Sequence, residues 1–170
     1  MKTLRIPFRV AFFTAVLAAL ASPIPARADW KPLAGTYTGA WKSTDTDGKS
    51  YSGTATIKIV SGPGNKVKVS LKTALFGNPI TGSVNAKASG NAAFTVTNPI
   101  LGTVTGTGKA TASGTKGKLS GSGPLYGIGT ATLAATLQRS SSGLKAKGTV
   151  VRAFPFVTNT LTFSFSGKAK

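Results

Sequence analysis

Few side chains in this chain could carry out acid–base or nucleophilic chemistry. The 170 residues contain no His, Cys or Glu, and the only acidic residues are Asp29, Asp45 and Asp47. General acid–base catalysis would therefore fall to Lys, Tyr or a single Asp. Two Ser-x-x-Lys sequences, 113–116 and 142–145, lie in expected turns and lack the partner motifs of enzymes that use such a pair. We therefore expect a protein that is not an enzyme.

The segment Asp45-Thr46-Asp47-Gly48 has the acidic residues and the glycine that open a calcium-binding loop. The bidentate Glu that completes such a loop is absent, and Lys42 and Lys49 flank the segment. An Asx turn, in which an Asp side chain accepts backbone hydrogen bonds, explains the segment better. We expect no metal and no cofactor.

Apolar residues around prolines are the most unusual feature of the chain. They recur in four segments about two strand lengths apart, namely 76–80, 98–102, 123–129 and 154–157. Proline fixes φ and the nearby glycines tolerate left-handed backbone, so most of these segments are expected to be loops. Between them lie turns rich in Ser, Gly, Asn and Lys, at 62–65, 89–91, 113–117 and 140–143.

The segments between these loops alternate apolar and polar residues. Ala55, Ile57 and Ile59 alternate with Thr and Lys, for example, and the same rhythm persists as far as Phe165. Such alternation, with many Thr, Val, Ile and Phe residues, is typical of half-buried antiparallel strands. We predict one all-β domain over residues 29–170, an antiparallel up-and-down meander of about ten strands.

A row of ten strands would leave two unpaired edges, and closure into a β-barrel removes them. The lysines fall almost wholly on the Thr/Ser face, which places Gly, Ala and Leu inside. Small inward residues such as Gly106, Gly121 and Gly148 would leave part of the interior empty. A small outer-membrane β-barrel is the alternative, although its lipid-facing side would be larger, poorer in Gly and bordered by aromatic girdles.

Successive turns of a meander fall at alternate ends, so the four proline-bearing loops should share one end of the barrel. This arrangement gathers six side chains that are far apart in the sequence: Phe76, Ile100, Leu101, Tyr126, Phe154 and Phe156. Either they fold inward and plug the barrel, or they form an exposed apolar rim. A rim of that kind marks a ligand mouth or a contact with a partner.

Gly39-Ala40-Trp41, preceded by Gly35-Thr36-Tyr37, resembles the Gly-x-Trp opening strand of the calycins, the lipocalin and avidin barrels. The resemblance implies a secreted ligand-binding barrel whose Trp packs at one end against a basic residue from a late strand. Trp41 and Arg152 are the matching residues here. The Thr-Asp-Tyr motif of lipocalins and the later Trp residues of avidins are missing. A Trp that caps the core of any small β-barrel would explain the same motif.

The charge of the chain is strongly one-sided. Residues 29–170 carry 17 basic residues against three Asp, a net charge of about +14. Such a potential attracts polyanions through steering and counterion release, so lipopolysaccharide, anionic glycans, acidic lipids and DNA are candidate partners without specific nucleic-acid recognition. Alternatively, the lysines only keep the protein soluble and prevent pairing between strands.

The first 28 residues have the order of a secretory signal peptide. Lys2, Arg5 and Arg9 precede an uncharged, mostly apolar stretch from Val10 to Ala21, and Ala26-Arg27-Ala28 offers the small residues of a cleavage site. We expect a secreted or periplasmic protein.

Together these features predict a non-enzymatic binding protein. Its ligand would be an amphiphilic or anionic molecule, such as a lipid, lipopolysaccharide or glycan, with the apolar rim holding the apolar part and surrounding Lys holding the charge. The alternative is a structural or surface-adhesive protein that associates with copies of itself. An outer-membrane barrel is a further alternative.

The exported protein should begin at Asp29, because Ala26 and Ala28 are the small residues that flank the cleavage site. N-terminal sequencing of material secreted by the native host tests this. Recovery of a chain that still begins at Met1 would contradict the expectation.

Overall fold

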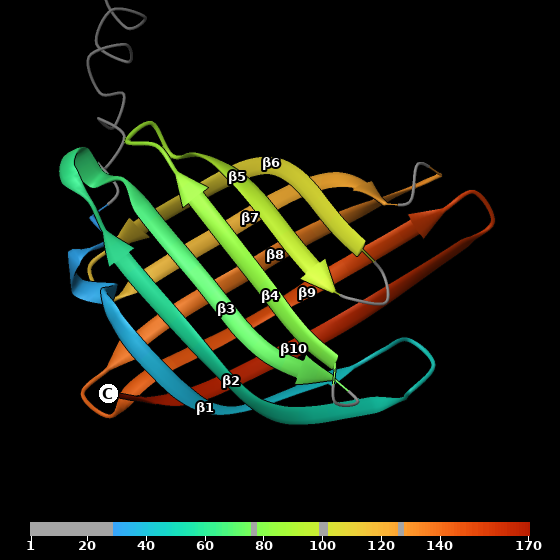
Figure 1. The fold of residues 1–170 in the computed structure, drawn as a ribbon, viewed down its shortest axis with the longest axis horizontal. Coiled ribbons are helices and arrows are strands. Elements are labelled where there is room, and N and C mark those ends of the chain that lie inside the picture. Colours follow the sequence, from blue (N-terminus) through green and yellow to red (C-terminus); the bar gives the residue numbers. More distant parts are fainter. Residues whose placement is uncertain (1–28, 76–77, 99–101, 126–127) are drawn as a thin grey trace, which may run out of the picture.

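A computed structural model describes residues 29–75, 78–98, 102–125 and 128–170. In these ranges ten antiparallel strands follow one another around a closed barrel, and the first strand pairs with the last (Figure 1). The all-β meander predicted from the sequence is confirmed, and so is its closure. The proposed signal segment, residues 1–28, lies outside the described residues.

Each strand pairs with its neighbours in the sequence. The strands are β1 (Gly35–Thr44), β2 (Ser50–Ser61), β3 (Val67–Leu75), β4 (Asn78–Ala86), β5 (Asn91–Asn98), β6 (Gly102–Ser113), β7 (Lys116–Leu125), β8 (Gly129–Ser140), β9 (Gly143–Phe154) and β10 (Val157–Ala169). Two short 3₁₀ turns, η1 (Lys31–Leu33) and η2 (Pro63–Asn65), are the helical elements of the described chain.

Alternate side chains of every strand point into the barrel. On β2, for example, Ala55, Ile57 and Ile59 are buried, whereas Lys58 between them is exposed. All ten strands contribute at least one buried side chain to a single core, which ends with Phe165 on β10. The period-two pattern therefore identified the inner and outer faces correctly.

The two ends of the barrel differ in chemistry, as the turn sequences predict. The end formed by the β2–β3, β4–β5, β6–β7 and β8–β9 connections is here called the polar-turn end, and the opposite end is the apolar-loop end (Figure 1). Gly64, Gly90 and Gly114 adopt positive φ at the polar-turn end. At the apolar-loop end, Asp45 Oδ1 accepts backbone hydrogen bonds from Asp47 and Lys49, which is the Asx turn expected there.

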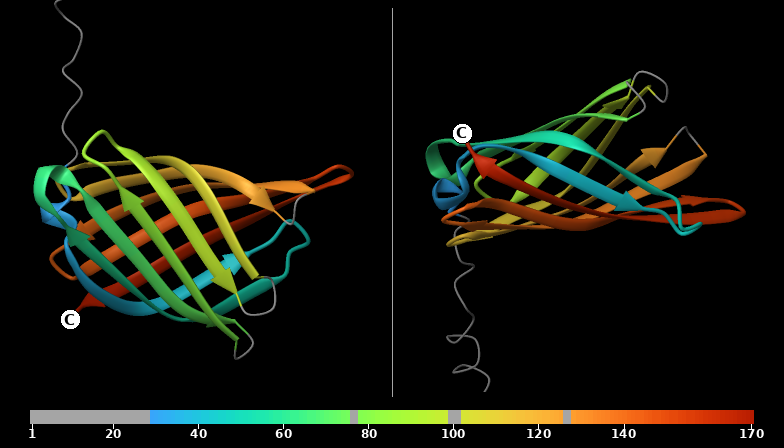
Figure 2. Two further views of the ribbon diagram at one scale, coloured as in Figure 1. Left: turned by 45° about the horizontal axis from the view of Figure 1, so that its top comes forward. Right: turned by 90° about the horizontal axis from the view of Figure 1, so that it is seen from below.

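The seam between β1 and β10 closes the sheet. Tyr37 to Thr44 on β1 pair in register with Ala169 to Thr162 on β10. The strands cross closely at Gly39, where an added Cβ would collide with the Ser166 carbonyl oxygen. The β1–β2 and β9–β10 hairpins consequently lie side by side at the apolar-loop end (Figure 2).

The polar-turn end is plugged by the segment that precedes β1. Trp30 and Leu33 are completely buried, together with Tyr37. Arg139, near the end of β8, donates from Nη1 to the carbonyl oxygens of Pro32 (2.8 Å) and Ala34 (3.1 Å). Its guanidinium also lies 5.9 Å from the centre of the Tyr37 ring, within cation–π range. These interactions of Arg139 hold the plug, residues 30–34, against the polar-turn end of the barrel.

Arg139→Leu should lower the free energy of unfolding by about 2 kcal/mol, because charged hydrogen bonds to two backbone carbonyls and the contact with Tyr37 are lost. Denaturant unfolding measures the effect. Lys145→Met, an exposed change on the neighbouring strand, is the control and should stay within about 0.5 kcal/mol of the parent. Equal stabilities of the two variants would contradict the assigned role of Arg139.

Candidate ligand cavity

The interior of the barrel holds a cavity of about 590 Å³. It extends from Leu119 and Leu137, in the polar-turn half of the barrel, to residues at the apolar-loop end such as Asp45. Its wall is mostly apolar and includes Trp41, Leu71 and Phe94. The volume lies within the range of about 300–1,000 Å³ that is usual for small-molecule sites.

Small inward residues leave this space unfilled. Gly82, Gly106, Gly121 and Gly123 line the cavity. At Gly82 an added Cβ would make only ordinary contacts, so the missing side chain leaves open space. At Gly106 and Gly123 a Cβ would collide with a backbone carbonyl oxygen of the neighbouring strand, and at Gly121 it would collide with the Phe94 ring. Barrels of eight strands are just wide enough for their side chains to fill, and ten strands enclose more space. The cavity therefore follows from strand number and residue size together, as the glycine pattern of the sequence suggests.

Charge within the cavity wall is confined to two side chains among the described residues, Arg152 on β9 and Asp45 in the β1–β2 turn. Arg152 Nη2 donates to Asn159 Oδ1 at 2.6 Å, and Asn159 Nδ2 donates to Thr46 Oγ1 at 2.9 Å. Arg152 Nε is buried without a hydrogen-bond partner. The resemblance to calycins singled out Arg152, and the structure positions it in the wall at the apolar-loop end of the cavity.

Trp41 lines the same cavity, packed against β2. Its indole Nε1 lies 2.9 Å from the position that a Cβ would take at Gly53, and this nitrogen is buried without a partner. Trp41 and Arg152 therefore share one cavity, but the hydrogen bond of Arg152 goes to Asn159.

Tyr37 and Arg139, not Trp41 and Arg152, make the contact between an aromatic ring and a basic side chain, and this contact lies at the plugged end. This pair was not predicted from the sequence. The available signal was Trp30 directly before Lys31-Pro32, together with an arginine that closes β8 next to a polar turn.

The expected apolar rim is described in part. Phe156, at the tip of the β9–β10 hairpin, is 101% exposed, and Ile128 and Val157 are also exposed. Phe154 is half-buried. Phe76, Ile100, Leu101 and Tyr126 lie outside the described residues. The tip at Phe156 therefore faces solvent and does not plug the barrel.

The lysines do not surround the apolar-loop end, contrary to the prediction from the sequence. Among the basic residues from Asp29 onward, Lys42, Lys49, Lys72 and Arg152 lie in the half of the barrel nearer the apolar-loop end. All the others lie in the half nearer the polar-turn end. Most lysines lie close to a polar turn in the sequence. Most of the positive charge is therefore far from the mouth of the cavity at the apolar-loop end.

No family model matches the chain, and no curated protein shows significant similarity to it. Within the described residues, no helix is both long enough and apolar enough to cross a bilayer. In the same residues, no three acidic, His or Cys side chains gather as metal ligands would.

Gly82→Leu should fill the cavity without disturbing the sheet. A Cβ at this position would lie 3.6 Å from Leu71 Cβ, an ordinary contact, and no other atom comes closer. We expect at least a tenfold loss of affinity for a hydrophobic fluorescent dye and a change of less than about 1 kcal/mol in the free energy of unfolding.

Thr81→Leu adds a similar side chain on the exposed face of the same strand and is the matched control. It should leave dye affinity unchanged. If Gly82→Leu and Thr81→Leu bind the dye as the parent does, the dye does not occupy the cavity.

Proposed function

We propose that this protein is a secreted or periplasmic, non-enzymatic carrier of an amphiphile with an anionic head. The apolar part of the ligand lies in the barrel cavity, and the head group meets Arg152 at the apolar-loop end. The observation that carries the proposal is an apolar cavity of about 590 Å³ with one guanidinium in its wall.

The apolar wall supplies most of the binding free energy. Each square ångström of apolar surface removed from water contributes about 25 cal/mol, so an acyl chain gains affinity with every buried methylene. The small inward glycines shape the space and add no polar groups of their own. A chain of methylenes or a flat aromatic group satisfies such a wall, whereas a sugar would lose its hydrogen bonds to water.

Arg152 supplies the preference for an anionic head. Its Nη2 bonds a neutral amide, Asn159, so the positive charge is not paired with a carboxylate through that bond. Guanidinium binds carboxylates and phosphates through paired, charge-assisted hydrogen bonds. This assignment revises the expectation from the sequence, because the positive charge in the cavity wall comes from one arginine, with Asp45 as the other charged side chain, in place of a ring of lysines.

The resemblance to calycins supports the same proposal. A closed antiparallel barrel that is plugged at one end and hollow toward the other is compatible with such a fold. The Gly39-Ala40-Trp41 motif opens its first strand, and the absence of His, Cys and Glu favours binding over catalysis.

Self-association is the second candidate function. Phe156, Val157 and Ile128 are exposed at the apolar-loop end, and exposed apolar residues of this kind favour contact with a partner or a second copy. An outer-membrane barrel is less favoured, because the outward faces of the strands carry Thr, Ser and Lys. Light scattering over a concentration series, without added ligand, separates self-association from ligand binding.

Arg152→Met should weaken binding of dodecanoate about tenfold and leave binding of dodecanol nearly unchanged, because a charge-assisted hydrogen bond contributes roughly 1.5–3 kcal/mol. Displacement of a fluorescent dye measures both affinities. Lys49→Met removes one positive charge from the same end and is the control. Equal losses for the acid and the alcohol would contradict the role of Arg152, and failure of the parent to bind either would reject the proposed function.

A further inference from the structure

Four exposed lysines form a grid on the outer wall of the barrel. Lys116 and Lys118 lie on β7, and Lys145 and Lys147 lie on β9. The strand register places Gln138 of β8 between Lys116 and Lys145, and Thr136 of β8 between Lys118 and Lys147. From ordinary strand geometry, the grid measures about 7 Å along the strands and about 10 Å across them.

The charge of this lysine grid is uncompensated by side chains of its own wall. Strands β6 to β10 lie wholly after Asp47, the last acidic residue of the chain. The neighbours of β7 and β9 are β6, β8 and β10, so no carboxylate side chain of an adjacent strand faces the grid.

The residues between the lysines are polar. Thr136 and Gln138 are both exposed, and toward the apolar-loop end Ser120 and Thr149 flank Ala134 in the next row. Hydroxyl and amide groups of this kind can hydrogen-bond the hydroxyls of a sugar. The grid therefore offers point charges at intervals with hydrogen-bonding groups between them.

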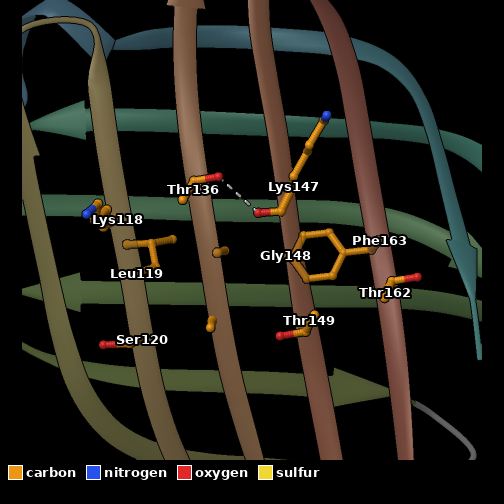
Figure 3. Close-up of a pocket in the computed structure, with 11 residues that line it drawn as sticks. Lys118, Leu119, Ser120, Thr136, Lys147, Gly148, Thr149, Thr162 and Phe163 are labelled. Carbon is orange, nitrogen blue, oxygen red and sulfur yellow. Dashed lines mark hydrogen bonds between the residues drawn. The ribbon is translucent and has the colours of Figure 1, made fainter.

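A hollow of about 660 Å³ borders the same wall (Figure 3). Lys118 and Lys147 line it, together with Thr136, whose hydroxyl donates to the Lys147 carbonyl oxygen. Gly148 and Phe163 also line it, and the Phe163 ring lies so close to Gly148 that an added Cβ would collide with it. Two of the four lysines of the grid thus flank a recess in the wall.

Large exposed hydrophobic side chains are absent from this part of the described surface. The large exposed hydrophobic residues are Val60 on β2, Val96 on β5, and Ile128, Phe156 and Val157 at the apolar-loop end. Single-stranded nucleic acids need aromatic platforms for their bases, and peripheral membrane binding combines basic with apolar groups. The lysine grid has neither, which favours a hydroxylated anionic polymer.

We propose that the lysine grid of β7 and β9 binds a linear anionic polysaccharide, carrying carboxylate or sulfate groups, independently of the cavity. Lysine contacts the anionic groups as point charges, so binding is steeply salt-dependent and tolerant of sugar sequence. The grid lies in the polar-turn half of the barrel. A protein held on a polysaccharide in this way keeps its cavity mouth free at the opposite end.

The test compares two quadruple variants that remove the same charge. The first replaces the grid, K116Q/K118Q/K145Q/K147Q. The second replaces four exposed lysines of the polar-turn half on the other side of the barrel, K58Q/K66Q/K68Q/K87Q. Binding to heparin and to alginate is measured against salt concentration, with single-stranded DNA and vesicles of anionic phospholipid as competing probes.

We expect the grid variant to lose at least tenfold in affinity for both polysaccharides at low salt, and the matched variant to lose less than threefold. Both variants should unfold like the parent and keep their affinity for the cavity dye. Failure of the polysaccharide proposal is therefore distinguishable from failure of the proposed carrier function. Equal losses in the two variants would overturn the proposal in favour of diffuse charge. Tighter binding of the parent to DNA or vesicles than to either polysaccharide would overturn the assigned class of ligand.

Discussion

The space inside a ten-stranded barrel is larger than its inward side chains can fill, and the rest of the molecule depends on how that space is divided. Large side chains close the polar-turn end, where Trp30, Leu33 and Tyr37 are completely buried. Arg139 fixes this plug through bonds to two backbone carbonyls. Toward the other end, small inward residues such as Gly82 leave a cavity. One end therefore stabilises the fold, and the other is available for a ligand.

The two-residue period of the strands separates two kinds of surface on one sheet. Inward positions such as Leu119 form the apolar cavity, and the adjacent outward position, Lys118, belongs to the lysine grid. Each face can change without altering the other, because successive side chains of a strand point to opposite sides. An apolar ligand and an anionic polymer can accordingly be bound by the same strands.

Much of the fold could be predicted from the sequence because its signals are local. Alternation, as in Ala55, Ile57 and Ile59, identifies strands and their faces, and turn residues such as Gly90 mark where the chain reverses. Because successive turns of a meander fall at alternate ends, the strand order also predicts which turns share one end of the barrel. The contact of Arg139 with Tyr37 could not be predicted in the same way, because it joins side chains of distant strands. The position of the lysines could have been predicted, since most of them lie close to a polar turn in the sequence.

The seam between β1 and β10 has a consequence for how the chain folds. Every other strand pair joins neighbours in the sequence and can form as a local hairpin, but the seam joins opposite ends of the described chain. Contacts between distant segments form slowly, since loop closure costs entropy before any contact forms. The seam should thus close late, and until then β1 and β10 expose unpaired edges. During that interval the open sheet is prone to exchange strands with a second molecule, a hazard that the finished barrel no longer has.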